Sequence, residues 1–305
     1  MSELMLDEPV PGVVPRLVVG AVLVAAGTAL VPIAGFAVRR IRGAIEARDG
    51  AVRGRELRGD AVRAVDAPPW GLGELAGGLL SAVLFAFLVS SALGRAHDVP
   101  LLVQLCGSIA TLAGGTLVAA ALARRSGASV LAAFAARVDG APRAAAAGVA
   151  GYVLLVPGLI GVALAWPATL EALGQGRPEQ AVVAAMRALP VSDRPVALLL
   201  GVVVGPLFEE LFFRGFLQRT LARYVPSSIA IVAASLAFAS LHGLAAFLPV
   251  FALSLILGSV LHATQRIAAS FAVHALFNAQ TFLFLWGLPE VGRVLEGSPP
   301  GLWNG

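Results

Sequence analysis

Long apolar runs dominate the chain, and they limit its fold more than any other feature. A helix that crosses about 30 Å of hydrocarbon needs roughly 20 mostly apolar residues, and inside lipid the backbone must satisfy its own hydrogen bonds. Runs of about this length occupy residues 17–38, 75–93, 101–122, 144–165, 196–221, 227–247, 248–262 and 267–287, the seventh being short. The sequence therefore predicts an all-α fold, a polytopic transmembrane helical bundle with about eight membrane helices.

The composition excludes several other classes of protein. Hydrophobic residues make up 58% of the 305 residues and charged residues only 13%, whereas soluble domains are about 25% charged. A net charge of +4 is too thinly spread to indicate a nucleic-acid partner. The single cysteine, Cys106, allows neither an intrachain disulfide nor a thiolate metal cluster, and we expect it to be a small core residue. The lipid bilayer is thus the first expected partner.

The arginines predict how the helices are oriented. All 22 basic residues are arginine, and if the helices alternate in direction, fifteen of them lie on one side of the membrane, six on the other, and Arg214 inside an apolar segment. Because cytoplasmic loops are enriched in basic residues, we expect the Arg-rich loop 39–66 in the cytoplasm and both termini outside. Segment 17–38 is followed by Arg39 and Arg40 rather than by a cleavage site, so we interpret it as a retained anchor.

The predicted organisation has five parts. They are an N-terminal membrane anchor helix (1–38), an Arg-rich cytoplasmic loop (39–69), membrane helices two to four with their loops (70–195), a catalytic helical core (196–290) and a C-terminal tail (291–305). The loop is interpreted as a solvated linker, with a surface for anionic lipid headgroups as the alternative. We expect Trp70 at the membrane interface and the glycines within helices to be packing residues.

Three charged residues interrupt the fifth apolar run. Glu209, Glu210 and Arg214 follow a stretch with no other polar side chain from residue 196. One charge at the centre of a membrane helix costs about 2.5–3.5 kcal/mol, so these side chains must face a protein interior or a wet cavity. Glu210 and Arg214 have the i, i+4 spacing of a helix ion pair, whereas Glu209 is rotated about 100° away. A buried pair that only joins two helices is the alternative to a functional site.

Two histidines in later apolar runs favour the functional interpretation. His242 follows Phe238 by one helical turn, and Asn278 follows His274 by one turn, which places each pair on one helix face. Two histidines, one asparagine and two glutamates on three helices are typical of a convergent site. From the rise per residue, His242 lies on the order of 10 Å too far outward to meet the others, a difference that helix tilt can absorb. The remaining histidines, His97 and His262, are expected outside this site.

Three motifs in these runs resemble those of the CPBP intramembrane proteases. They are Glu-Glu-Leu-Phe-Phe-Arg at 209–214, Phe-Ala-Ser-Leu-His at 238–242 and His-Ala-Leu-Phe-Asn at 274–278. That family includes CAAX prenyl endopeptidases, abortive-infection proteins and bacteriocin self-immunity proteins. Each four-residue spacing is weak alone, but the three occur in the family's order, 33 and 32 residues apart. The resemblance covers about residues 196–290.

The resemblance implies an endopeptidase and assigns roles to these residues. Glu209 would activate water together with His242, and His274 and Asn278 would polarise the scissile carbonyl or hold the site. Glu210 and Arg214 would fix the helix, with Phe238 packing under the imidazole of His242. The expected substrate is a membrane protein or a lipidated peptide, in a bacterial cytoplasmic membrane, with the site open toward the cytoplasm.

The metal requirement and the function class each leave alternatives. Zinc is one candidate cofactor, with Glu209, His242 and His274 as its ligands, and a metal-free glutamate mechanism is the other. The helical H-E-x-x-H signature of zinc proteases is not present. A non-proteolytic immunity or scaffold protein that keeps the motifs for structure is the alternative function. A transporter is a third class, but the inverted repeats typical of transporters are not found.

Overall fold

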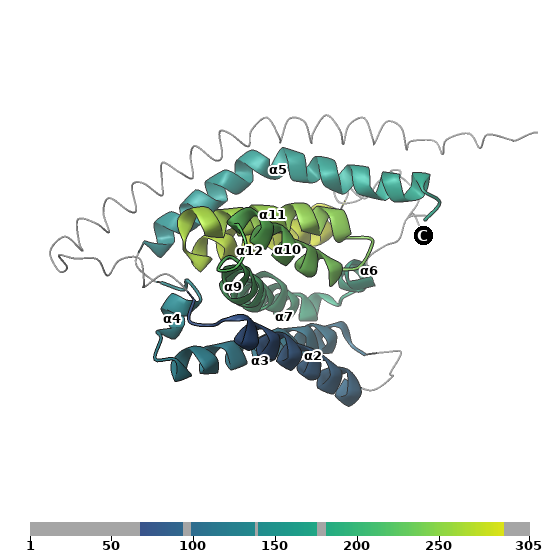
Figure 1. Ribbon diagram of the computed structural model, residues 1–305. Coiled ribbons are helices and arrows are strands. Elements are labelled where there is room, and N and C mark those ends of the chain that lie inside the picture. Colours follow the sequence, from purple (N-terminus) through teal and green to yellow (C-terminus); the bar gives the residue numbers. More distant parts are fainter. Residues whose placement is uncertain (1–67, 94–98, 138–139, 176–180, 290–305) are drawn as a thin grey trace, which may run out of the picture.

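The computed structural model describes residues 68–93, 99–137, 140–175 and 181–289, and these form helices joined by turns and loops, without a strand (Figure 1). This confirms the all-α prediction. The longer helices are α2 (Leu72–Leu93), α3 (Leu101–Arg125), α5 (Ala141–Ala172), α10 (Ser227–Ser240), α11 (Phe247–Thr264) and α12 (Ile267–Phe282), which continues into the π-helix η5 (Leu283–Gly287). The short helices are α4 (Val130–Ala133), α6 (Ala181–Arg187) and the 3-10 turn η2 (Val191–Asp193).

The fifth apolar run forms one continuous helical segment, Val191–Leu221, with two π-helical stretches in it. Its parts are α7 (Arg194–Leu198), η3 (Leu199–Val204), α8 (Gly205–Glu209), η4 (Glu210–Gln218) and α9 (Arg219–Leu221). π-Helical turns are rare and are frequent at functional sites. η4 contains Glu210 and Arg214, and η3 is separated from Glu209 only by the short helix α8.

Six helices of the described residues are long and apolar enough to cross a membrane. They are Leu72–Ser91, Leu101–Arg125, Ala141–Ala172, Val191–Leu221, Phe247–Thr264 and Ile267–Gly287. The predicted membrane helix 17–38, the loop 39–66, His97 and the C-terminal tail lie outside the described residues. The predicted count of eight therefore stays a prediction, while the polytopic helical bundle is confirmed.

The predicted sixth membrane helix, 227–247, is wrong at its C-terminal end. Helix α10 stops at Ser240 after 14 residues, and a turn over 241–246 leads into α11 at Phe247. Gly243 in this turn has φ +74°, a left-handed conformation that glycine adopts without strain. Hydropathy does not detect such a turn, because the residues around Gly243 are themselves apolar. His242 consequently lies in the turn and not inside a helix.

The fifth apolar run lies at the centre of the bundle (Figure 1). Helices α2 and α3 pack together on one side of it, and α10, α11 and α12 lie on the other side. The long helix α5 covers α11 and α12 from outside. Charged residues in the central segment are thus surrounded by protein on both sides, as the cost of exposing charge to lipid requires.

Two side-chain contacts define how the central segment and α11 are aligned. Arg214 donates to the hydroxyl of Ser254 at 2.8 Å, and Gln218 donates to the carbonyl of Gly258 at 3.0 Å. The second contact lies four residues after the first on both helices, so η4 and α11 run in the same direction. This agrees with the predicted alternation, in which the fifth and seventh helices are parallel.

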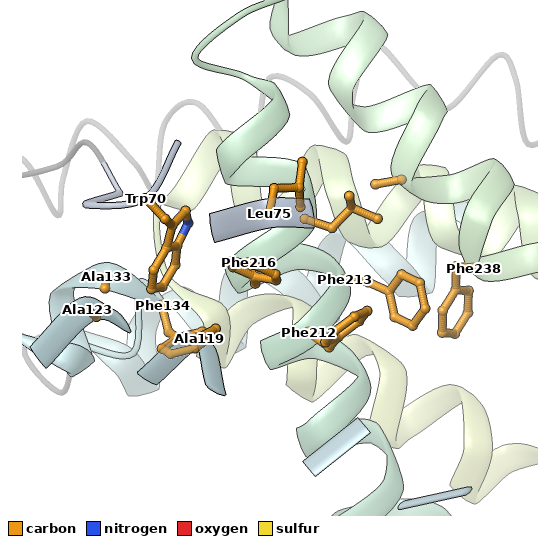
Figure 2. Close-up of a cluster of buried hydrophobic side chains, with 12 residues drawn as sticks. Trp70, Leu75, Ala119, Ala123, Ala133, Phe134, Phe212, Phe213, Phe216 and Phe238 are labelled. Atoms are coloured by element: carbon orange, nitrogen blue, oxygen red, sulfur yellow. The ribbon is translucent and has the colours of Figure 1, made fainter. Parts of the chain in front are cut away.

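An aromatic row connects the start of α2 to the middle of the bundle (Figure 2). Trp70 packs on Phe134 and Phe216 with ring centroids 5.1 Å apart in both pairs. The row continues through Phe212 and Phe213 to Phe238. Trp70 is fully buried in the protein, so its side chain packs against other rings, and its expected depth at the membrane interface stays a prediction.

Two further expectations concern exposure. Cys106 is exposed and not a core residue, because it lies on the side of α3 that no other described helix covers. His262 is exposed near the C-terminal end of α11 and does not approach the charged residues of the central segment.

Several helical glycines are contact points between helices, as predicted, and Gly148 is one that meets the backbone of another helix. A Cβ atom added there would lie 2.6 Å from the backbone carbonyl oxygen of Ala269, so α5 and α12 approach as closely as their backbones allow. We expect Gly148→Ala to lower the free energy of unfolding by about 1–3 kcal/mol, since a backbone atom cannot yield as a side chain can. The measurement is thermal unfolding of the purified protein in detergent.

Gly77→Ala is the matched control for that substitution. Gly77 lies in α2 with no other residue's atom within 4 Å of the added Cβ. Alanine also has the higher helix propensity, so this variant should be at least as stable as the wild type. Equal stability of the two variants would show that α5 and α12 can move apart to accommodate the added methyl group without a loss in the free energy of unfolding.

Candidate active site

The two adjacent glutamates of the central segment have different surroundings. Glu209 ends α8 and Glu210 begins η4, and successive residues of a helix point about 100° apart. The side chain of Glu210 is fully buried, whereas that of Glu209 is 24% exposed. One carboxylate is therefore enclosed by protein, and the other reaches a surface that a ligand can approach.

Glu210 is held by the arginine one turn along its own helix. Arg214 Nε lies 3.6 Å from Glu210 Oε2, and both side chains are at most 1% exposed. Arg214 also donates to Ser254 on α11, and its guanidinium carbon lies 4.4 Å from the ring centre of Phe238. The ion pair expected from the spacing is present. Ser254 was not foreseen, although a serine in the apolar run 248–262 was a detectable signal.

His274 lies between the two glutamates. Its Nδ1 is 2.9 Å from Glu210 Oε1, and its Nε2 is 3.4 Å from Glu209 Oε2. A neutral imidazole carries one N–H and can donate to one carboxylate only. Both contacts are favourable when one further proton is present on His274 or on Glu209. The arrangement can thus hold an exchangeable proton next to the exposed carboxylate.

Phe238 and His242 form the side of the site that belongs to α10. The Phe238 ring lies 4.6 Å from the His242 ring and 5.8 Å from the His274 ring, centre to centre. His242 Nδ1 is 2.8 Å from the carbonyl oxygen of Phe238, so a proton on Nδ1 donates to it and leaves Nε2 as a base. Within the described part of the chain, no hydrogen bond or ion pair joins His242 to Glu209. Phe238 is the group that brings both histidines to the same region.

Asn278 lies one turn beyond His274 and contacts the other end of the central segment. Its Nδ2 donates to the carbonyl oxygen of Gly201 at 2.7 Å. Gly201 lies in the π-helix η3, where the wider turn changes the ordinary backbone hydrogen bonding. Gly201 precedes Glu210 in the central segment, whereas its partner Asn278 follows His274 in α12. The two helices are therefore antiparallel. Gly201 was not identified from the sequence, because a glycine in an apolar run carries no distinguishing signal.

An apolar groove of about 460 Å³ adjoins the Asn278 end of the site. It lies between η3 on one side and the junction of α12 with η5 on the other. Its lining consists of Leu198, Leu199, Val202, Val203, Ala279, Phe282, Leu283 and Trp286. A hydrophobic chain can therefore lie beside the polar groups without leaving an apolar environment.

The candidate metal ligands Glu209, His242 and His274 do not form a tight donor set. Both ring nitrogens of His274 face carboxylates, and Nδ1 of His242 faces a backbone carbonyl. The described residues contain no group of three His, Cys, Asp or Glu side chains placed to hold a metal ion. A catalytic zinc site uses three protein ligands. This donor geometry does not fit such a site.

The comparison with protein families concerns the same part of the chain. Residues 191–280 match the family model described as type II CAAX prenyl endopeptidase Rce1-like. The matched range includes all three motifs and every site residue named above except Trp286, Phe282 and Leu283 of the groove. No curated protein and no solved structure matches the chain.

Proposed function

Because residues 191–280 form an Rce1-like domain of the CAAX prenyl endopeptidase type, we propose that the protein is an intramembrane endopeptidase acting on a membrane-associated or lipidated substrate. The observation that carries the proposal is the placement of His274 between a buried and an exposed glutamate within a membrane-spanning segment. A purely structural ion pair needs only Glu210 and Arg214. It gives no reason for a second glutamate that reaches the open side.

In the proposed reaction, Glu209 is the general base. Its carboxylate takes a proton from a water molecule, and the resulting hydroxide attacks the scissile carbonyl carbon. His242 Nε2 accepts a hydrogen bond from the O–H that remains and so orients the nucleophile. Glu209 then passes the proton to the leaving nitrogen, so that one water is consumed and one acid and one amine are formed. General-base catalysis of this kind is worth about 10²–10⁴-fold in rate.

The oxyanion that forms during the attack needs hydrogen-bond donors. We assign this role to Nε2–H of the protonated His274 and to the second N–H of the Asn278 amide, whose first N–H donates to Gly201. Glu210 keeps His274 oriented through Nδ1, and Arg214 balances the buried charge of Glu210. The contacts that orient His274 and Asn278 are already made without substrate, which is the arrangement expected of a preorganised site.

The proposed mechanism uses no metal ion, and this leads to a prediction. Removal of divalent metals with EDTA or 1,10-phenanthroline should leave the rate of peptide cleavage within about twofold, because no step passes through a metal-bound water. The rate is measured with purified protein in nanodiscs before and after chelation. A loss of activity that added zinc restores would overturn the metal-free mechanism and return Glu209, His242 and His274 to the role of ligands.

The proposed function itself is tested by profiling peptide termini. Membranes are compared from cells that express the wild type, Glu209→Ala or His274→Ala at equal abundance. New N- and C-terminal peptides that occur with the wild type and are lost with both variants would identify a protease and its substrate. Identical profiles for three folded proteins would instead favour a non-proteolytic immunity or scaffold role.

The proposal also includes the location of the protein, which is a bacterial cytoplasmic membrane with the active site open to the cytoplasm.

A further inference from the structure

The turn that carries His242 is attached to a helix far away in the sequence. Residues 241–246 connect α10 to α11, and the indole N–H of Trp166, on α5, donates to the carbonyl oxygen of Leu244 at 2.9 Å. Trp166 precedes the family match at 191–280. A residue outside that domain therefore contacts the segment that presents one of its candidate catalytic groups.

Besides that bond, few contacts with other helices fix the middle of the turn. Leu241 and Leu244 are 71% and 52% exposed, whereas Ala246 at the start of α11 is buried. Gly243 has a left-handed φ and, without a Cβ atom, more conformational freedom than other residues. The backbone bonds of the turn connect it only to its own flanking residues, for example from Phe247 N–H to the carbonyl of Leu244. Apart from Trp166, no side chain outside α10 and the turn itself makes a hydrogen bond to residues 241–246 within the described part of the chain.

The length of α10 makes this contact more important. Helix α10 has 14 residues and spans about 21 Å at 1.5 Å per residue, which is less than the about 30 Å of hydrocarbon that a membrane-crossing helix covers. The turn therefore follows a short helix, and the Trp166 bond is its attachment to the longer helix α5. An indole N–H from a neighbouring helix is suited to this place, because the tryptophan ring is apolar and its donor is polar.

We infer that Trp166 is a positioning residue, which holds the 241–246 turn so that His242 faces the exposed carboxylate of Glu209. The inference rests on the proposed function for its catalytic consequence, but not for the tethering of the turn. Phe238 supports the His242 ring from the α10 side, and Trp166 holds the turn two residues beyond it. Loss of the second attachment leaves the imidazole present but variable in direction.

The test substitutes Trp166 by Phe, which keeps an aromatic ring and removes the N–H. Trp286→Phe is the matched control, because its indole donates to the carbonyl of Met186 at 3.0 Å and does not contact the turn. Hydrogen–deuterium exchange of the amides of 241–246, measured on full-length protein in nanodiscs, should rise at least about threefold in Trp166→Phe and stay unchanged in Trp286→Phe. Equal exchange in both variants would overturn the inference whether or not the protein cleaves peptides.

Cleavage kinetics then separate positioning from a general effect on the fold. Trp166→Phe should lower kcat about tenfold with KM unchanged, since a small misplacement of a catalytic group reduces the rate without weakening binding. Trp166→Gln, which restores a donor, should recover part of the loss. Increased exchange with an unchanged kcat would show that the turn is tethered but that His242 is not used, and would overturn the positioning role. A wild type without activity would instead count against the proposed function.

Discussion

Glu209→Gln is expected to lower kcat by at least about 10³-fold while the protein remains folded. The amide has the size of the carboxylate but cannot accept a proton from water, and the loss lies within the range of general-base catalysis. Glu209 is 24% exposed and has one ionic contact, to His274, so its neutralisation does not leave an unpaired buried charge. The rate is measured in nanodiscs with a peptide that contains the cleavage site found by profiling.

Glu74→Gln is the control for the effect of removing a carboxylate. Glu74 is an exposed residue in the first turn of α2, and its side chain accepts a hydrogen bond from the backbone of Gly71. This variant should keep the wild-type kcat. If Glu209→Gln kept more than about a tenth of the wild-type kcat, Glu209 would not be the general base, and the role would pass to His242.

Arg214→Met is expected to give the largest loss of stability, about 3–5 kcal/mol, because it removes the arginine that balances the buried charge of Glu210 and leaves His274 as its remaining partner. Methionine has a similar length but no charge, so the effect is electrostatic and not one of volume. The substitution also removes the donor to Ser254 and the cation over Phe238. The measurement is equilibrium or thermal unfolding in detergent, followed by the tryptophan fluorescence of the protein.

The double substitution Glu210→Gln with Arg214→Met tests this explanation. Removing both charges should recover a large part of the lost stability, because neither group is then left unpaired. Arg124→Met is the control, since Arg124 is exposed at the end of α3, and it should change stability by at most about 0.5 kcal/mol. A double variant no more stable than Arg214→Met would mean that the arginine acts through packing and not through charge.

Local properties of the sequence were sufficient for the helical architecture and for the set of candidate residues. Apolar runs predicted the six helices that are long enough to span a membrane, because hydropathy depends on each segment alone. The i, i+4 spacing predicted the Glu210–Arg214 pair, since both residues lie on one helix. The three motifs identified the family that matches residues 191–280.

Two features could not be predicted from local sequence. The apolar residues around Gly243 masked the end of α10, so that His242 was placed in a helix. The burial of Trp70 was not foreseen, because nothing nearby in the sequence indicates Phe134 and Phe216 as its partners. In both cases, neither the composition of the segment nor the periodicity of its apolar residues indicates the contact or the dihedral angle that is responsible.

The pattern of residues was sufficient to identify a helical membrane protein with two adjacent glutamates, two histidines and an asparagine in apolar surroundings. The packing of the helices was needed to establish that Glu210 is buried and Glu209 partly exposed, that His274 lies between them, and that Asn278 donates to Gly201. These relations join residues 64 to 77 positions apart. They depend on the rotation and tilt of whole helices, which the packing of all their side chains sets together and no single segment encodes.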